Sequence, residues 1–399
     1  MDWIDSFCED TQALAPMEFR TWTGIGVIAA ALERRVYIYS DKGILYPNLY
    51  TLLTGGPGSG KSLMVNQARE FIRAVPELHI GPDNPTRRSF LDCLQKSTRT
   101  FGLLNGADSF TMYQAMFVAS RELGVLISKY DAAFINDLSD IYDNPDRYSA
   151  PRASTTDVTL EKPTVNILGA VTPDLIGEIF PDVAWWQGLT SRLLLIYGSK
   201  IPNPRRNIFD KFIPKSKQNL SQSLEIISVL SGESIWTSAA QDASNDWINE
   251  GMPPAPTYEK LRYYCERRDS HVLKLSIIAA VSRTGKLTVE LEDFTRARQW
   301  LTTAEEKMPD VFRAMNQKND VQQIKDLHYH FWSVYSSSAV NKRVAIPKDV
   351  IWDWLTKHTT SDKIPKLFDA AVNAGYFAKS PIYPDHWIPK RLDQAGDIL

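Results

Sequence analysis

The residues best suited to chemistry lie in one glycine-rich stretch, GGPGSGKS, at positions 55–62. The spacing G-x-x-x-x-G-K-S lets successive backbone N–H groups converge on phosphates, while the lysine and the serine hydroxyl act on the terminal phosphates and on Mg²⁺. We therefore predict a site for ATP and Mg²⁺, in which Lys61 contacts the phosphates and Ser62 the metal. The predicted nucleotide-binding residues are Gly55, Gly56, Pro57, Gly58, Ser59, Gly60, Lys61, Ser62 and Leu63.

A phosphate loop of this kind needs a strand before it and a helix after it. Residues 48–54, NLYTLLT, form an apolar run that predicts a buried strand. Residues 62–75 repeat apolar side chains at helical spacing, which predicts an amphipathic helix. Further upstream, residues 16–34 predict an apolar helix and residues 36–39 a short strand. The glycine-rich stretch therefore lies in the required context.

ATP hydrolysis requires an acidic side chain at the end of a second strand, where it polarises the attacking water and holds Mg²⁺ through water. Two residues could supply this carboxylate. Glu122 ends the apolar run 116–122, and Asp131 follows the next apolar segment. We favour Glu122, because residues 131–148 predict a helix for which Asp131 is a natural N-cap, and Asp131 remains the alternative.

Two other strands carry a polar residue at one end. Residues 165–171 predict a buried strand followed by Thr172, whose hydroxyl could contact the terminal phosphate or the attacking water, or could belong to a simple turn. Arg192 directly precedes the apolar strand 193–197. Because a charge there cannot enter the core, we expect Arg192 to project from the sheet, either solvated or as an arginine finger toward a neighbouring subunit's nucleotide.

A helical region after the strands offers further cations. Arg267, His271 and Lys274 are spaced to lie near one helix face, and Arg268 is a fourth candidate. One of them could contact the terminal phosphate from a lid helix, and solvated charges on an ordinary helix are the alternative.

Contacts to nucleic acid are predicted in residues 144–162, a polar and irregular segment before the strand that ends at Thr172. Arg147 and Arg152 could bind backbone phosphates, and Tyr148 could stack on a base. An exposed loop with a few charges is the alternative interpretation.

Composition limits the remaining possibilities. The formal net charge is −2 over 399 residues, so a nucleic-acid site has to be a local basic patch. The three cysteines are widely spaced, which argues against a disulfide framework or a CxxC metal motif and favours a reducing cytoplasm. The apolar run 24–32 is too short to cross a bilayer, so no membrane partner is expected.

The order of predicted elements divides the chain into four parts. Strands alternate with helices up to the proline-rich residues 201–214, which predicts an α/β core with a mainly parallel sheet. The chain is then mainly helical, with a capped helix over 288–308. The expected parts are an N-terminal helical segment (1–40), a P-loop ATPase core of the AAA+ or RecA type (41–205), a helical lid (206–317) and a winged-helix-like domain (318–399).

The winged-helix prediction rests on the order of short elements at the C-terminal end. Helices are expected over 321–335, 347–358 and 361–375, with a short strand over 344–346 and extended pieces YFAKS and HWIPK after them. Acidic residues interrupt the basic ones in this part, so docking to a protein is as compatible with it as binding to DNA.

In combination, these motifs resemble a known family. PNLYTLLTGGPGSGKS, ASRELGVLI, LSDIYD, ILGAVTPDLI and GLTSRLLLIYG follow one another as in the P-loop ATPases of phage and mobile-element replication modules. The resemblance covers roughly residues 16–310 and implies ATP and Mg²⁺ at the glycine-rich loop, Glu122 for water activation, Thr172 as sensor and Arg192 as finger. Members often have an Asp-Glu pair where this chain has Arg121 and Glu122, which leaves Ser62, water and Ser120 to help hold the metal.

The family resemblance implies a ring-forming motor, a hexamer, that acts on single-stranded or forked DNA in the cytoplasm of a bacterial host, with primase or other replication proteins as partners. A DNA helicase is the leading hypothesis. A nucleotide-switched helicase loader is the alternative, and a small-molecule kinase is a third, less favoured one because it seldom needs a helical lid and a winged helix.

Overall fold

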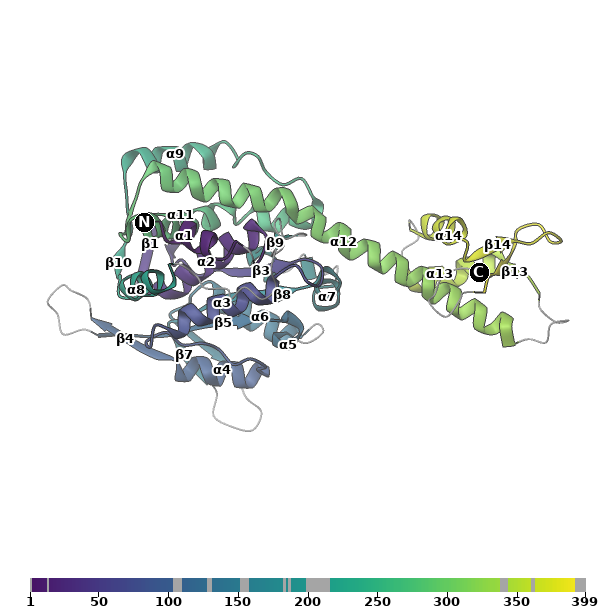
Figure 1. Ribbon diagram of the computed structural model, residues 1–399, viewed down its shortest axis with the longest axis horizontal. Coiled ribbons are helices and arrows are strands. Elements are labelled where there is room, and N and C mark those ends of the chain that lie inside the picture. The colour runs from purple at the N-terminus through teal and green to yellow at the C-terminus, as the bar shows by residue number, and fades with distance from the viewer. Residues whose placement is uncertain are drawn as a thin grey trace. The chain divides into compact units, whose positions relative to one another are not determined.

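The computed structural model describes residues 2–12, 14–102, 110–127, 131–150, 158–181, 184–185, 188–198, 216–337, 344–359 and 363–391. The chain forms two compact units, Met1–Phe312 and Arg313–Leu399 (Figure 1). The first unit contains residues from all of the three parts that were expected before residue 318. Within the described residues, no helix is both long and apolar enough to cross a membrane.

The first unit is built on a five-stranded sheet with the order β4-β5-β8-β3-β9. Its strands are β3 (Tyr50–Thr54), β4 (Thr98–Gly102), β5 (Phe110–Ser120), β8 (Pro163–Val171) and β9 (Leu193–Tyr197). All neighbouring pairs are parallel except β4 with β5, which places the antiparallel strand at one edge. The prediction of an α/β fold with a mainly parallel sheet is therefore confirmed.

Helices cover the sheet, and its central strands are correspondingly apolar. Every residue of β3 and β8 is buried, as expected for parallel strands with both faces covered. Helix α2 (Met17–Leu32) packs on β8 and β9 and against α3 (Lys61–Arg73), and Phe90 of α4 (Arg87–Lys96) packs on Phe134 of α6 (Ala132–Tyr142) with ring centroids 5.0 Å apart.

The remaining elements of the first unit surround this core. The helices are α1 (Trp3–Asp10), α5 (Leu123–Leu126), α7 (Pro173–Ile179), α8 (Lys217–Ile227), α9 (Ser238–Asn249), α10 (Arg262–Cys265) and α11 (Arg268–Thr284). Short strands pair outside the central sheet: β1 (Val36–Ser40), β2 (Gly43–Leu45), β6 (Arg147–Ala150), β7 (Val158–Glu161), β10 (Gly232–Glu233), β11 (Ile235–Trp236) and β12 (Thr288–Val289).

The register of the sheet brings distant parts of the chain together at its carboxyl end. Thr54 of β3 is paired with Val171 and with Tyr197, and Ser120 of β5 is paired with Gly169. The segments that follow β3, β5 and β8 therefore emerge side by side. The opposite edge holds the amino ends of the same strands, where Tyr50 pairs with Leu193.

The helix predicted over 131–148 is shorter than expected. It ends at Tyr142, because Asn144 has a left-handed φ of 53° and Pro145 cannot continue an α-helix. The chain then forms the hairpin of β6 and β7, with Arg147 opposite Glu161. The prediction of an irregular segment over 149–162 is wrong for the described strand β7.

The helix predicted to end at Met308 instead continues as α12 (Leu291–Ser337), which includes Pro309 and contributes residues to both units. A proline usually interrupts a helix. Here the buried side chains continue at helical spacing on both sides of it, at Met308, Val311 and Phe312, so packing outweighs the lost backbone hydrogen bond.

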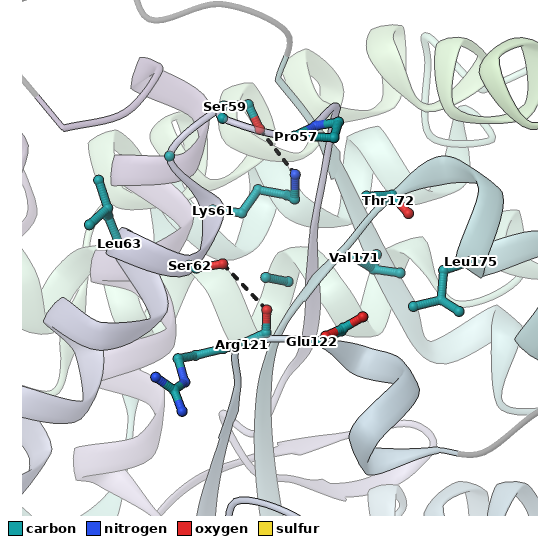
Figure 2. A pocket seen from close by; sticks show the side chains of 13 residues that line it. Pro57, Ser59, Lys61, Ser62, Leu63, Arg121, Glu122, Val171, Thr172 and Leu175 are labelled. Carbon is teal, nitrogen blue, oxygen red and sulfur yellow. Dashed lines mark hydrogen bonds between the residues drawn. The ribbon is translucent and has the colours of Figure 1, made fainter. Parts of the chain in front are cut away.

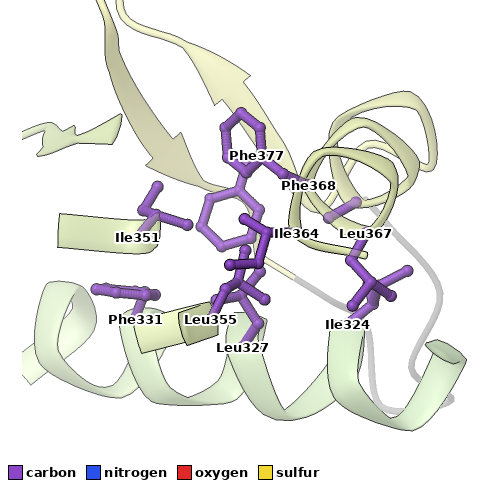
Figure 3. Packing of buried hydrophobic residues seen from close by; sticks show 10 residues of the cluster. Ile324, Leu327, Phe331, Ile351, Leu355, Ile364, Leu367, Phe368 and Phe377 are labelled. Carbon is purple, nitrogen blue, oxygen red and sulfur yellow. The ribbon is translucent and has the colours of Figure 1, made fainter. Parts of the chain in front are cut away.

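The second unit packs the end of α12 against two helices and a small sheet. Its elements are β13 (Ile346–Pro347), α13 (Lys348–His358), α14 (Ile364–Asn373), β14 (Phe377–Lys379) and β15 (His386–Pro389), with the antiparallel strand order β13-β15-β14. A single cluster of buried residues from all three helices and β14 forms the core (Figure 3): Ile324, Leu327, Phe331, Ile351, Leu355, Ile364, Leu367, Phe368, Ala371 and Phe377.

Candidate functional site

A pocket of about 360 Å³ lies at the carboxyl end of the sheet, where β3, β5 and β8 end (Figure 2). It joins three of the sequence-predicted features: the glycine-rich loop, Glu122 and Thr172. The lining residues are Pro57, Gly58, Ser59, Gly60, Lys61, Ser62, Leu63, Arg121, Glu122, Ala170, Val171, Thr172 and Leu175. A ligand that sits on the loop would therefore contact the ends of two further strands.

The shape of the loop depends on glycine at two positions. Gly60 has a left-handed φ of 88°, and a Cβ there would collide with the carbonyl of Leu14. A Cβ on Gly55 would collide with the carbonyl of Gly198. The chain before α2 and the chain after β9 thus both press against the loop, and together they hold it in place.

Lys61 begins α3, and its side chain folds back over the loop. Its Nζ donates hydrogen bonds to the carbonyls of Gly55 (2.6 Å) and Gly56 (2.7 Å) and to Ser59 Oγ (3.2 Å). Burial lowers the pKa of this ammonium below its usual range. An anion in the pocket would offer Lys61 a charged acceptor in place of these neutral carbonyls.

The floor of the pocket is formed by the residues that follow β5. Ser62 Oγ donates to the carbonyl of Arg121 at 3.4 Å, and Ser120 Oγ donates to the carbonyl of Glu122 at 2.8 Å. The Glu122 residue is exposed and precedes the short helix α5 without a side-chain capping bond. Its carboxylate is therefore not committed to a capping role in the fold.

The side chains present can accept Mg²⁺ only with the help of a ligand. Among the described residues, no group of three or more His, Cys, Asp or Glu side chains could hold a metal ion. Mg²⁺ bound with nucleotides usually takes one or two protein groups, substrate phosphates and waters. The Ser62 hydroxyl and the Glu122 carboxylate line the same pocket and fit that arrangement.

A neighbouring cavity of about 490 Å³ shares Ser62 and Glu122 and also contains Asp83 and Arg69. Asp83 forms an ion pair with the buried Arg69. Sequence analysis did not single out Asp83, because no strand or glycine pattern precedes it. Only the folded chain brings this carboxylate near the loop.

Asp131, the alternative acid, caps α6. Its Oδ1 accepts a hydrogen bond from the N–H of Phe134 at 3.0 Å, as expected for an N-cap. It does not line the pocket that holds the loop. The structure thus brings Glu122, and not Asp131, to the loop.

Arg192 lies at the opposite end of the sheet from the loop, directly before β9. The expectation that it projects from the sheet is wrong, because the residue is only 7% exposed. Its guanidinium pairs with the Asp143 carboxylate, with 3.3 Å from Nε to Oδ1, and donates to the Gly188 carbonyl at 2.6 Å. The partly exposed Asp143 neutralises the charge and allows the arginine to be buried.

The candidate cations of the helical region are also buried and lie away from the loop pocket. Arg268 forms a two-pronged ion pair with the buried Glu305, at 2.7 and 2.8 Å. Lys274 Nζ donates to the carbonyl (3.1 Å) and the Oδ1 (2.9 Å) of Asn48. None of the four lines that pocket, so the interpretation as solvated charges is wrong for Arg268, His271 and Lys274, and contact with this chain's own loop is not observed.

Burial sets the protonation of this region. It lowers the pKa of Lys274 from 10.5 to about 7. Burial and the neighbouring Lys274 lower the pKa of His271 from 6.5 to about 3. Both groups therefore favour the neutral form in the folded chain, and the folded chain binds fewer protons than the unfolded chain above these values.

The Lys274 pKa predicts an unusual pH dependence of stability. Between pH 7 and 10.5 the unfolded chain keeps the Lys274 proton and the folded chain loses it, so the Lys274 contribution to the unfolding free energy rises with pH, by about 1 kcal/mol per unit. Lys274→Met should remove this slope, and Lys96→Met, at an exposed lysine, should preserve it. Urea denaturation at pH 7.5, 8.5 and 9.5 measures the difference, and equal slopes for all three proteins would contradict the prediction.

The predicted nucleic-acid residues lie on the β6–β7 hairpin. Arg147 is exposed and pairs with Glu161 at 3.5 Å. The Tyr148 hydroxyl donates to Asp137 at 2.7 Å, which restrains its ring from stacking freely on a base. Arg152 lies outside the described residues.

No protein-family profile matches this sequence, and a search of curated proteins finds no match. The geometry of the pocket is therefore the main basis for a functional assignment.

Proposed function

We propose that this chain is an ATPase that works as the ring-forming motor of phage-type DNA replication, a DNA helicase. The observation that carries the proposal is the single pocket that contains the glycine-rich loop, Glu122 and Thr172. A loop of this sequence between a buried strand and a helix favours a nucleoside triphosphate, and an acid across the pocket favours its hydrolysis.

Each residue would have a distinct role around the triphosphate. The N–H groups at the start of α3 lack intrahelical acceptors and face an anion favourably. Lys61 would exchange the carbonyls of Gly55 and Gly56 for phosphate oxygens. Ser62 and Glu122 would hold Mg²⁺, which neutralises charge on the phosphates when bound. Glu122 would also accept a proton from the attacking water, which Thr172 would help to position.

The proposed P-loop core, lid and winged helix draw support from the order of elements. The helices α8 to α11 follow the last strand of the sheet, where a lid is expected. In the second unit, the order helix, strand, two helices and hairpin is typical of a winged helix. The exposed residues of α14 include both Lys366 and Asp369, so direct reading of DNA by this helix is weakly supported.

A ring draws support from the position of Arg192. It lies about 15 Å along the sheet from its own loop, since β3 separates the two and rises about 3.3 Å per residue. A head-to-tail ring would bring this edge of one subunit to the loop of the next.

The first test is removal of the loop lysine. Lys61→Ala should lower ATP affinity at least about 100-fold, because a charge-assisted contact to two phosphates contributes about 3 kcal/mol. Binding of a fluorescent ATP analogue measures the affinity, and phosphate release measures turnover with and without single-stranded DNA. Lys96→Ala, at an exposed lysine of α4, is the matched control. Unchanged affinity in Lys61→Ala would remove the basis of the proposal.

A nucleotide-switched helicase loader is the second candidate, and Arg121 favours it. An arginine beside Glu122 gives the pocket a cation where a second carboxylate would assist hydrolysis. Unwinding of a forked DNA duplex by the wild-type chain, lost in Lys61→Ala, selects the helicase. Slow turnover that DNA does not stimulate, together with stable binding of a separate helicase, selects the loader.

A further inference from the structure

Three charged side chains from separate parts of the chain meet at the amino end of the sheet. Asp143 follows α6, Arg192 precedes β9, and Arg267 precedes α11. Asp143 Oδ1 accepts from Arg192 Nε at 3.3 Å and from Arg267 Nη1 at 3.2 Å, and Asp143 Oδ2 pairs with Arg192 Nη2. One carboxylate thus bridges two guanidinium groups.

Positive charge exceeds negative charge around this bridge. Lys274 lies behind it with 2% of its surface exposed, and its Nζ contacts Asn48 and the ring of Tyr142 (4.1 Å to the centroid) but no carboxylate. In the described part of the chain, Asp143 is the only carboxylate paired with either arginine. The cluster therefore has room, in charge, for a group that carries more than one negative charge.

Asp143 is also the most accessible member of the bridge. Its side chain is 47% exposed, against 31% for Arg267 and 9% for Arg192. The carboxylate can turn toward solvent without uncovering apolar surface, whereas the Arg192 side chain is held by the Gly188 carbonyl at 2.6 Å. An incoming anion could thus replace Asp143 while Arg192 stays in place.

We propose that Arg192 and Arg267 form one binding site for the terminal phosphate of a nucleotide held by a second copy of this chain, and that Asp143 occupies this site until the copies assemble. Planar guanidinium groups bind carboxylate and phosphate oxygens with the same forked geometry, and phosphate carries the greater charge. The inference rests on the proposed function, and it adds Arg267 and Asp143 to the roles expected of Arg192.

The decisive experiment mixes two inactive variants. Arg267→Ala should lower ATP turnover at least about 10-fold while the subunit still binds the fluorescent nucleotide, because its own loop is intact. Lys61→Ala keeps the arginine pair but loses the loop. In a 1:1 mixture about one interface in four joins an intact loop to an intact pair, so turnover should partly recover. Arg262→Ala, at an exposed arginine of α10, is the control and should keep wild-type turnover.

The outcomes separate the two proposals. If the wild-type chain neither binds nor hydrolyses ATP, the proposed function fails. If the wild type hydrolyses ATP but Arg267→Ala is as active as Arg262→Ala, or the mixture stays inactive, this inference is overturned while the ATPase stands. Loss of single-stranded DNA affinity in Arg267→Ala, with no recovery on mixing, would assign the arginines to nucleic acid instead and would also overturn it.

Asp143→Asn tests the competing carboxylate. Without the negative charge, the protein concentration that gives half-maximal turnover should fall several-fold, because assembly no longer has to break the internal ion pairs. An unchanged or higher concentration in a folded variant would contradict the role of Asp143. If Asp143→Asn does not fold, Asp143→Glu, which retains the charge on a longer side chain, should still shift that concentration, and an unchanged value would count against the role.

Discussion

Glu122→Gln should abolish most ATP turnover, about 1,000-fold, while nucleotide affinity changes little. General-base catalysis by a positioned carboxylate contributes between 10² and 10⁴ in rate, and the amide of glutamine cannot accept the proton. The substitution preserves side-chain size at an exposed residue without a capping bond, so folding should be unaffected. Single-turnover phosphate release, compared with binding of the fluorescent nucleotide, separates chemistry from affinity.

Asp131→Asn is the matched control, since asparagine can also cap α6 through the N–H of Phe134. It should keep full turnover, because Asp131 does not line the pocket. A large loss in Asp131→Asn together with normal turnover in Glu122→Gln would reverse the assignment of the acid. Equal activity of both variants would mean that the chain uses another group, of which Asp83 is the nearest carboxylate in the adjoining cavity.

Glu305→Ala should destabilise the first unit by about 3–5 kcal/mol, because it leaves the Arg268 charge buried without its partner. Arg268 is 1% exposed, and both prongs of its guanidinium bind Glu305. The Tyr264 hydroxyl also donates to the same carboxylate at 2.9 Å and would lose its acceptor. Urea denaturation followed by circular dichroism measures the change in unfolding free energy.

Glu306→Ala provides the control for this pair. Glu306 is the next residue of α12, but it is exposed, so its removal should change the unfolding free energy by less than about 0.5 kcal/mol. Similar losses in the two variants would indicate that helix propensity, and not the ion pair, dominates. A large and selective loss in Glu305→Ala would identify Arg268 as a structural residue and remove it from the candidates for phosphate contact.

The pocket could be predicted from sequence because its parts follow simple rules. The apolar runs before the glycine-rich loop, Glu122 and Thr172 are long enough for buried strands. Parallel strands present their carboxyl ends at one edge of the sheet, so residues that follow different strands meet there. This reasoning needs no knowledge of the order of the strands, and the observed pocket contains all three features.

Features that depend on distant partners could not be predicted in this way. The burial of Arg192 depends on Asp143, which belongs to another element and lies 49 positions earlier in the chain. Lys274 is buried because Asn48 and Tyr142 surround its ammonium, although its spacing resembles an exposed helix face. Pro309 predicts the end of a helix, but buried side chains on either side extend α12 past it.

The position of Lys61 links nucleotide binding to proton uptake. In the free chain its ammonium is 8% exposed and contacts only neutral oxygens, which lowers its pKa. A triphosphate in the pocket would surround the same ammonium with negative charge and raise that pKa again. Wherever the free lysine is partly deprotonated, each nucleotide therefore binds together with a fraction of a proton. Affinity for the nucleotide then falls with rising pH through this residue alone, and part of the binding heat depends on the buffer that supplies the proton.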